Sequence, residues 1–194
     1  MDELRLKIQH LRKFPSQEGP SILLPFVPEA DLFSLLSRGT ITNALADSKF
    51  QLEHHQRGPV ADEVVDGARK IFAILVELRL EDKLKKCLEK CLTDSSLPVL
   101  EEKRLGELLP ESATHFEKLQ WEYVPLKFRE GAHKDLESGR ILPYVKNTKI
   151  TSGGFSTIFN ITIHPSYQDW HRSSTAGVSH TLAKVGPTIT LSRV

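Results

Sequence analysis

The feature that most constrains the fold is a change in the spacing of apolar residues near Gly139. Upstream of it, apolar residues recur every three or four positions, which is typical of helices that face a core. Downstream, Phe159, Ile161 and Ile163 alternate with residues assigned to the other face, such as Ile158 and Thr162, as along a strand. The sequence therefore predicts a mainly α, α+β chain in which an N-terminal helical region precedes a small β-hairpin.

Several helices are expected within the first part. One helix covers residues 61–78, and the pattern resumes at Leu84 after a break near residues 80–82. A short helix begins at Pro28 and ends at Gly39, which suits a left-handed stop, and a second covers residues 42–46. Residues 99–109 form one more helix, and the aromatic-rich stretch 114–128 is expected to be an irregular connector packed onto the helices.

Composition restricts the partners. The 194 residues carry 26 Lys plus Arg against 25 Asp plus Glu, and this balance gives no support to a nucleic acid or an acidic membrane as a partner. The N-terminus lacks the apolar core of a secretory signal, and the run Ile71–Val76 falls far short of the ~20 residues that cross a bilayer. A soluble protein of the cytoplasm or nucleus is expected.

The two cysteines, Cys87 and Cys91, are four positions apart, which places both thiols on one helix face. We expect both to be buried and reduced, rather than to bind zinc with His54 and His55, because no standard ligand spacing is present. The eight histidines likewise match no motif of a metal enzyme or hydrolase. Charged residues beside the apolar stripe are expected on solvated helix faces; they are Arg69, Lys70, Lys83, Lys85 and Lys86.

Gly153 and Gly154 lie on a turn between a strand near residues 141–150 and a strand near residues 158–163. Backbone N–H groups can approach a phosphate closely where side chains are absent, and hairpin turns also use glycine for geometry alone. Both interpretations of the turn are open at this point. A lone hairpin is marginal in water, so it must dock on the helices, recruit a partner strand or stay partly disordered.

The stretch ILPYVKNTKITSGGFSTIFNITIHPSYQ resembles the start of the kinase domain in a large fungal class of proteins with a helical region before a protein kinase domain. The upstream stretches LLPFVPEADLFSLLSRGTITNAL, ARKIFAILVEL and FEKLQWEYVPLKF are similar to that helical region, so the resemblance runs from about Leu24 to Gln168. It implies that Ile150 and Ile158 pack on an adenine and that Phe155 covers the phosphates of ATP.

The chain departs from the kinase pattern at identifiable positions. The three glycine positions of G-x-G-x-x-G are Thr151, Gly153 and Ser156, and the phosphate-binding lysine corresponds to Lys184, which follows Ala183 directly. The resemblance implies ATP as a ligand. No HRD or DFG tripeptide occurs in the sequence, so Mg²⁺ is implied only where a complete kinase domain exists. Whether the chain takes part in an enzyme is left open.

We therefore expect a truncated protein kinase-like chain with a vestigial ATP-binding glycine loop and no complete catalytic site. Its parts are a helical regulatory or interaction region at 1–135, a kinase-like hairpin at 136–170 and a flexible tail at 171–194. The alternative is a helical module that binds an unknown protein partner and no nucleotide.

Overall fold

A computed structural model of the chain describes residues 1–18, 24–129, 139–152 and 157–169. The chain forms two compact units, and each draws on two separate stretches of sequence. The helical unit comprises Met1–Arg12 and Val27–Val124; the sheet unit comprises Lys13–Phe26 and the chain from Pro125 onward. The backbone consequently passes from one unit to the other three times.

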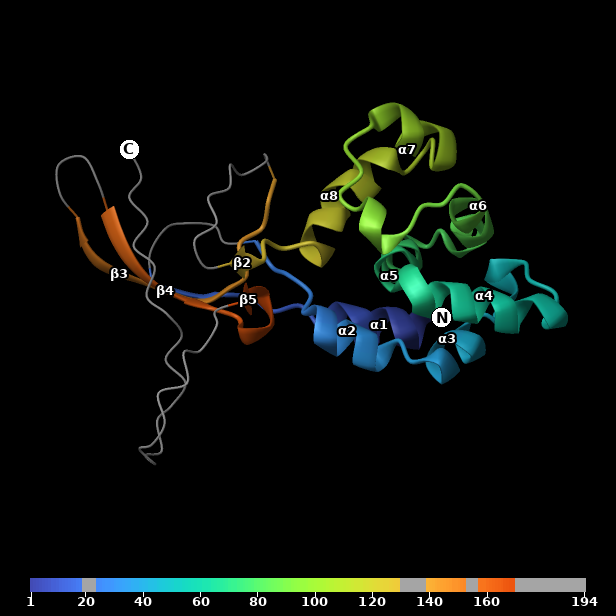
Figure 1. Ribbon diagram of the computed structural model, residues 1–194, viewed down its shortest axis with the longest axis horizontal. Coiled ribbons are helices and arrows are strands. Elements are labelled where there is room, and N and C mark those ends of the chain that lie inside the picture. The colour runs from blue at the N-terminus through green and yellow to red at the C-terminus, as the bar shows by residue number, and fades with distance from the viewer. Residues whose placement is uncertain (19–23, 130–138, 153–156, 170–194) are drawn as a thin grey trace. The chain divides into compact units, whose positions relative to one another are not determined.

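The helical unit is built from eight α-helices, all within its described residues (Figure 1). In chain order they are α1 (Asp2–His10), α2 (Glu29–Leu35), α3 (Arg38–Ala44), α4 (His54–Gly67), α5 (Arg69–Leu78), α6 (Leu84–Glu89), α7 (Glu102–Leu108) and α8 (Ala113–Tyr123). Short 3₁₀ turns separate some of them: η1 (Ser48–Phe50), η2 (Glu81–Lys83) and η3 (Asp94–Ser96).

Helix α5 forms the centre of the helical unit. Its six central residues, Ile71 to Val76, are all apolar, and each is fully buried. Six consecutive apolar residues cover every side of a helix, so this part must be surrounded by other elements, and α5 contacts α1, α2, α4 and α8. Phe72 stacks on Phe50 of η1 with ring centroids 5.6 Å apart, which extends this core to the neighbouring turn.

The single helix predicted over residues 61–78 is wrong, because the backbone breaks at Ala68, where φ is −139°. Gly67 has low helix propensity at the end of α4, and the carboxylate of Asp94 accepts hydrogen bonds from the backbone N–H groups of Lys70 and Ile71. These bonds satisfy donors at the start of a new helix, so α5 begins as an element of its own.

Two further helix predictions need correction. Gly39 does not end a helix: α2 ends at Leu35, and Gly39 lies inside α3. The first turn of α3 is capped by the Ser37 hydroxyl, which accepts from the Thr40 N–H.

The stretch expected to be an irregular connector forms α8 instead, with Phe116, Gln120, Trp121 and Tyr123 buried. Helical spacing of large residues outweighs the modest helix propensity of aromatics.

The expected pair of buried thiols is also wrong. Cys87 is buried on α6, but this helix ends at Glu89, and Cys91 follows it as an exposed residue with φ of 53°. The left-handed backbone at Cys91 turns its side chain away from the face that Cys87 occupies. Both thiols are free.

Arg69 and Lys70 do not form a solvated face either. The Arg69 guanidinium carbon lies 4.7 Å from the centroid of the Phe33 ring. The Lys70 ammonium is 2.6 Å from a carboxylate oxygen of Glu29, and its side chain is 14% exposed. These contacts join the start of α5 to α2.

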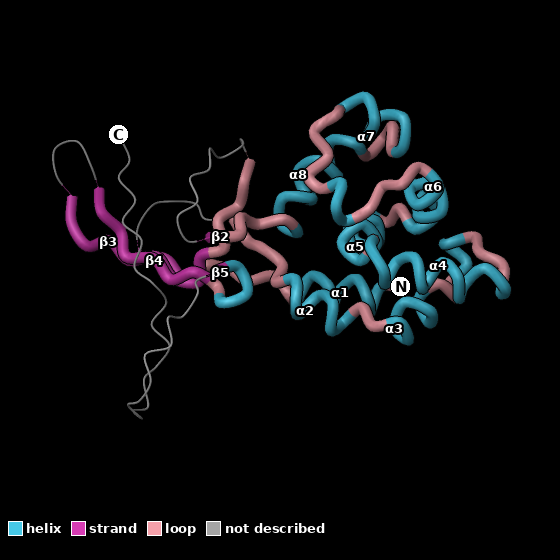
Figure 2. The backbone as a smooth tube through the Cα atoms, viewed as in Figure 1, coloured by secondary structure: helices cyan, strands magenta, loops and turns pink. Residues whose placement is uncertain are grey.

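The sheet unit confirms the predicted hairpin. Strands β3 (Tyr144–Ser152) and β4 (Thr157–Ile163) pair antiparallel, and Figure 2 shows them as the two long strands of the chain. Strand β1 (Ser16–Glu18) adds to β3 in parallel, with Ser16 opposite Lys146. A separate pair joins β2 (Phe128–Arg129) to β5 (Gln168–Asp169). The hairpin thus recruits a partner strand, and the strand comes from the N-terminal part of the sequence.

A small apolar cluster supports the sheet. Ile161 and Ile163 are buried on one face of β4, as their alternation predicts. The Phe26 ring is fully buried and makes edge contacts with His164 and Tyr167, at centroid distances of 5.7 and 5.6 Å. After β4, the ring nitrogen of His164 accepts from the Ser166 N–H and begins the 3₁₀ turn η4 (Pro165–Tyr167). The described part of the chain contains no helix long and apolar enough to cross a membrane.

Candidate functional site

The residues expected at a nucleotide loop divide into two groups. Gly153, Gly154, Phe155, Ser156 and Lys184 lie outside the described residues. Ile150, Thr151 and Ile158 lie on the hairpin, where Thr151 is directly opposite Ile158. The structure therefore brings together the residues on either side of the turn.

Ile150 has an unusual position on β3. Lys149 pairs with Phe159 and Thr151 pairs with Ile158, so this register shift leaves Ile150 without an opposite residue on β4. Its side chain is 59% exposed, next to the turn. An exposed aliphatic side chain at a bulge offers an apolar surface to a flat ligand.

A second register shift gives an internal comparison. Tyr144 pairs with Ile163 and Lys146 pairs with Thr162, which leaves Val145 as the extra residue at the start of β3. Val145 is 39% exposed and lies at the end of the strand farther from the turn. The two exposed apolar side chains of β3 are therefore its two bulge residues, and neither bulge could be found from the alternation of residues alone.

The other face of β3 is closed. Tyr144 and Asn147 are buried, and within the described residues the Tyr144 hydroxyl and the Asn147 side-chain oxygen have no hydrogen-bond partner. Burial raises the pKa of Tyr144 to about 12. The phenol is therefore neutral at physiological pH, and β3 offers no charge from its buried face.

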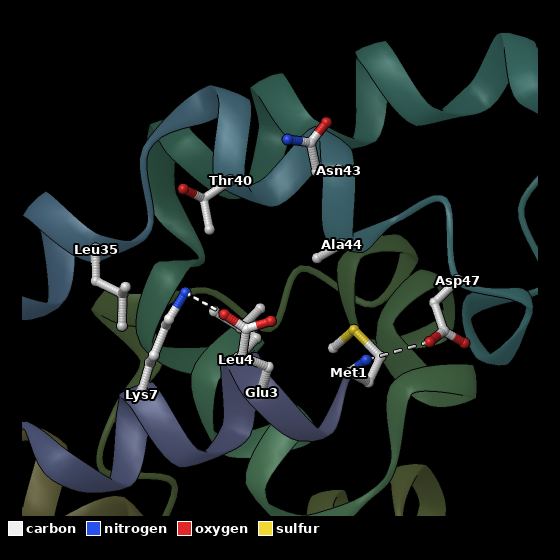
Figure 3. Close-up of a pocket in the computed structure, with 9 residues that line it drawn as sticks. All are labelled: Met1, Glu3, Leu4, Lys7, Leu35, Thr40, Asn43, Ala44 and Asp47. Carbon is white, nitrogen blue, oxygen red and sulfur yellow. Dashed lines mark hydrogen bonds and ion pairs between the residues drawn. The ribbon is translucent and has the colours of Figure 1, made fainter.

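A groove in the helical unit is a second candidate site (Figure 3). It has a volume of about 590 Å³ and is lined by residues of α1, α2, α3 and the turn after α3: Met1, Glu3, Leu4, Lys7, Leu35, Thr40, Asn43, Ala44 and Asp47. Figure 3 shows Lys7 directed toward Glu3, with 2.6 Å between the ammonium nitrogen and the carboxylate oxygen. The lining combines apolar side chains, such as Leu4 and Leu35, with charged and polar ones, such as Glu3 and Asn43.

A smaller hollow lies beside the start of α4. Its volume is about 510 Å³, and its lining is Thr42, Asn43, Ala46, His54, His55, Arg57, Gly58 and Pro59. This lining includes two histidines but no cysteine or carboxylate. Across the described residues, no group of three or more His, Cys, Asp or Glu side chains is placed to hold a metal ion.

A partly buried network of charges has no counterpart among the sequence predictions. Arg12, which follows α1, donates to Glu77 of α5 and to Glu122 of α8, each over 2.6 Å, and the Tyr123 hydroxyl also donates to Glu77. Burial acts to lower the pKa of Arg12, but the hydrogen bond and charge of Glu77 outweigh it and the pKa lies above its usual value. Burial raises the pKa of Glu122 and of Tyr123. Partners this distant in sequence leave no local signal.

Comparison of the chain with family models, with curated proteins and with solved structures gives no match.

Proposed function

We propose that the sheet unit binds a nucleoside triphosphate at the turn between β3 and β4. The observation that carries this proposal is the exposed Ile150, a bulge residue of β3 that is 59% exposed beside the turn. This is the position at which the resemblance to protein kinases expects an aliphatic side chain to pack on adenine. Covering the exposed surface of this Ile with an aromatic ring would make the free energy of binding more favourable, because apolar surface is removed from water.

The remaining parts of the proposed site rest on the sequence. By the resemblance to protein kinases, Gly153 and Gly154 would leave backbone N–H groups free of side chains near the phosphates, and Phe155 would cover the phosphates. Ser156 and Lys184 stand at the positions of the third glycine and the phosphate-binding lysine. The same resemblance assigns Ile158, which pairs with Thr151, to the other side of the adenine. ATP would bring Mg²⁺ with it as a phosphate-bound ion.

The proposal concerns binding and not phosphoryl transfer. Protein kinases position the acceptor hydroxyl with the aspartate of an HRD segment and hold Mg²⁺ with the aspartate of a DFG segment. Neither tripeptide occurs in this sequence. The helical unit is proposed to have a regulatory or docking role.

A pair of matched variants tests the nucleotide site. Ile150→Ser removes the exposed aliphatic surface near the turn, and Val145→Ser removes a similar surface from the other bulge. We expect Ile150→Ser to weaken Mg-ATP binding, measured by calorimetric titration, by about tenfold, because covering an aliphatic side chain contributes roughly 1.5–3 kcal/mol when complete. Val145→Ser should bind as tightly as the unmodified chain.

The contrary result is well defined. If millimolar Mg-ATP neither binds nor raises the unfolding temperature of the unmodified chain, the nucleotide proposal fails, since a ligand of the folded state must stabilise it. Equal losses in the Ile150 and Val145 variants would point to damage of the strand and not to a binding site.

The second candidate function is protein binding by the helical unit, favoured by the groove between α1 and α3. Ala44→Arg places a long charged side chain in the groove. Gly106→Arg places the same side chain on α7, where a Cβ would meet no atom within 4 Å. We expect the first variant to lose proteins that cross-link to the unmodified chain in cells, and the second to retain them. Identical cross-linking patterns for the two variants would contradict binding in this groove.

A further inference from the structure

The smaller hollow, beside the start of α4, lies wholly within the helical unit. We call it the α4 hollow. Helix α3 and the turn after it contribute Asn43 and Ala46 to its lining, and the start of α4 contributes its basic side chains, His54, His55 and Arg57. The two helices pack against each other, so contacts inside one unit fix its shape. Its volume of about 510 Å³ is within the usual range for pockets that bind small molecules.

Arg57 has incomplete hydrogen bonding in this hollow. Its side chain is partly buried, and its Nε atom is buried without a hydrogen-bond partner. Glu53 lies four positions earlier, a spacing that suits an ion pair on a helix, but within the described residues no carboxylate pairs with Arg57. A buried N–H group without an acceptor is unfavourable, and a guanidinium stays charged. Arg57 therefore has a charged donor for which the described residues supply no acceptor.

The charge of the lining favours an anion as the ligand. The lining holds one arginine and two histidines and no carboxylate. The next acidic residue along α4 after Glu53 is Asp62, and its carboxylate is paired with Arg38. A metal ion is disfavoured, because the guanidinium of Arg57 would repel it and two imidazoles are the only common metal ligands in this lining.

We infer that the α4 hollow binds the phosphate group of a small molecule, with Arg57 as the main ligand and with His54, His55 and Asn43 as further donors. A phosphate group presents several oxygens in a tetrahedral arrangement, so it can accept from donors that come from two helices. The fork of N–H groups on arginine matches this geometry, and an imidazole keeps an N–H donor even when neutral. The site does not depend on nucleotide binding by the sheet unit.

Titration of the full chain with inorganic phosphate tests the site. Backbone amides are followed in proton–nitrogen correlation spectra at constant ionic strength and without nucleotide. We expect saturable shifts of the amides of residues 42–46 and 54–58, because these segments line the hollow. Acetate at the same concentrations should shift them much less, since a carboxylate has two oxygens in one plane and satisfies fewer donors.

A pair of variants at Ala46 tests the role of charge. Ala46 is exposed and lines the hollow, so substitutions there leave the core intact. Ala46→Glu introduces a carboxylate that competes with phosphate for Arg57, and Ala46→Gln introduces an uncharged side chain of nearly the same size. We expect Ala46→Glu to raise the Kd for phosphate about tenfold or more and Ala46→Gln to leave it within about twofold of the unmodified value.

A second pair of variants tests Arg57 directly. Arg57→Met removes the guanidinium and keeps an unbranched side chain, whereas Arg38→Met removes an arginine of α3 that does not line the hollow. We expect Arg57→Met to lose the saturable shifts and Arg38→Met to titrate like the unmodified chain.

Three results would overturn the site. They are an absence of saturable shifts in the unmodified chain, equal affinities for phosphate and acetate, and equal Kd values for Ala46→Glu and Ala46→Gln. The Ala46 pair decides the question even if Arg57→Met does not fold, because both of its members keep Arg57 and differ only in charge.

Discussion

At the scale of single residues, the two cysteines have different environments. Cys87 lies in the apolar core, and burial raises the pKa of its thiol to about 11. Cys91, four positions later, is exposed because its left-handed backbone ends the helical face. The spacing of the two thiols is plain from the sequence, but no local pattern indicates that α6 ends between them, at Glu89.

This difference predicts selective labelling of the native protein. The thiolate is the reactive form, and at pH 8 a buried thiol with a pKa near 11 supplies very little of it. We expect iodoacetamide to modify Cys91 at a rate close to that of a free thiol and Cys87 only after denaturation, as measured by peptide mass spectrometry. Cys91→Ser should abolish labelling of the native protein. Rapid modification of Cys87 in the native protein would contradict the burial of its thiol.

Single residues also mark the limit of sequence interpretation at the candidate site. Ile150 was singled out from its place before the glycines, but its exposure follows from a register shift in the hairpin. Such a shift depends on how two strands pair, and alternation within one strand does not encode it. The ion pairs of Arg12 with Glu77 and Glu122 were missed for a similar reason, because they join residues 65 and 110 positions apart.

At the scale of elements, η3 completes a helix that precedes it in the chain. Both carboxylate oxygens of Asp94 accept from the Lys70 N–H, at 2.9 and 3.1 Å, and one also accepts from the Ile71 N–H. Burial raises the pKa of Asp94, while these two N–H groups act in the opposite direction. Helix α5, whose centre is fully buried, thus obtains its cap from a turn 24 residues further on.

Removal of this cap should destabilise the helical unit. We expect Asp94→Ala to lower the free energy of unfolding, measured with urea, by about 0.5–2 kcal/mol, the usual cost of losing a capping side chain. Asp66→Ala, at an exposed position of α4, is the control and should change it by less than about 0.5 kcal/mol. Equal effects of the two substitutions would argue against a capping role for Asp94.

The elements that the sequence predicted well are those whose pattern is local. Apolar spacing located the buried face of α5, and alternation located β4, because each signal repeats within one element. The boundary between α4 and α5 was missed because a distant carboxylate decides it. The pairing of β1 with β3 was open for the same reason, since nothing in SQE itself identifies its partner.

At the scale of the whole molecule, the two units differ in which stretches of the sequence supply their core residues. Every residue of the main hydrophobic core, from Ile8 to Tyr123, belongs to the helical unit. Helix α1 is fixed to this core by Arg5, which donates to the Val76 carbonyl over 2.8 Å and to buried Glu81 over 3.0 Å. The sheet unit, in contrast, takes β1 and Phe26 from a segment that lies between two parts of the helical unit.

Two fragments should therefore behave differently. A fragment of residues 1–124 contains the complete helical core, and we expect a helical circular dichroism spectrum with cooperative thermal unfolding. A fragment of residues 27–124 lacks Ile8 and leaves Glu81 buried without Arg5, so it should unfold at a much lower temperature or without cooperativity. Similar melting of the two fragments would contradict the role of α1.

The origin of β1 also imposes an order of events during protein synthesis. Ser16 leaves the ribosome about 130 residues before Lys146, the residue with which it pairs. Domains tend to fold as they emerge from the ribosome, so the helices can assemble before β3 is synthesised and can pair with β1. Strand β3 then completes a sheet with a strand that was translated about 130 residues before it.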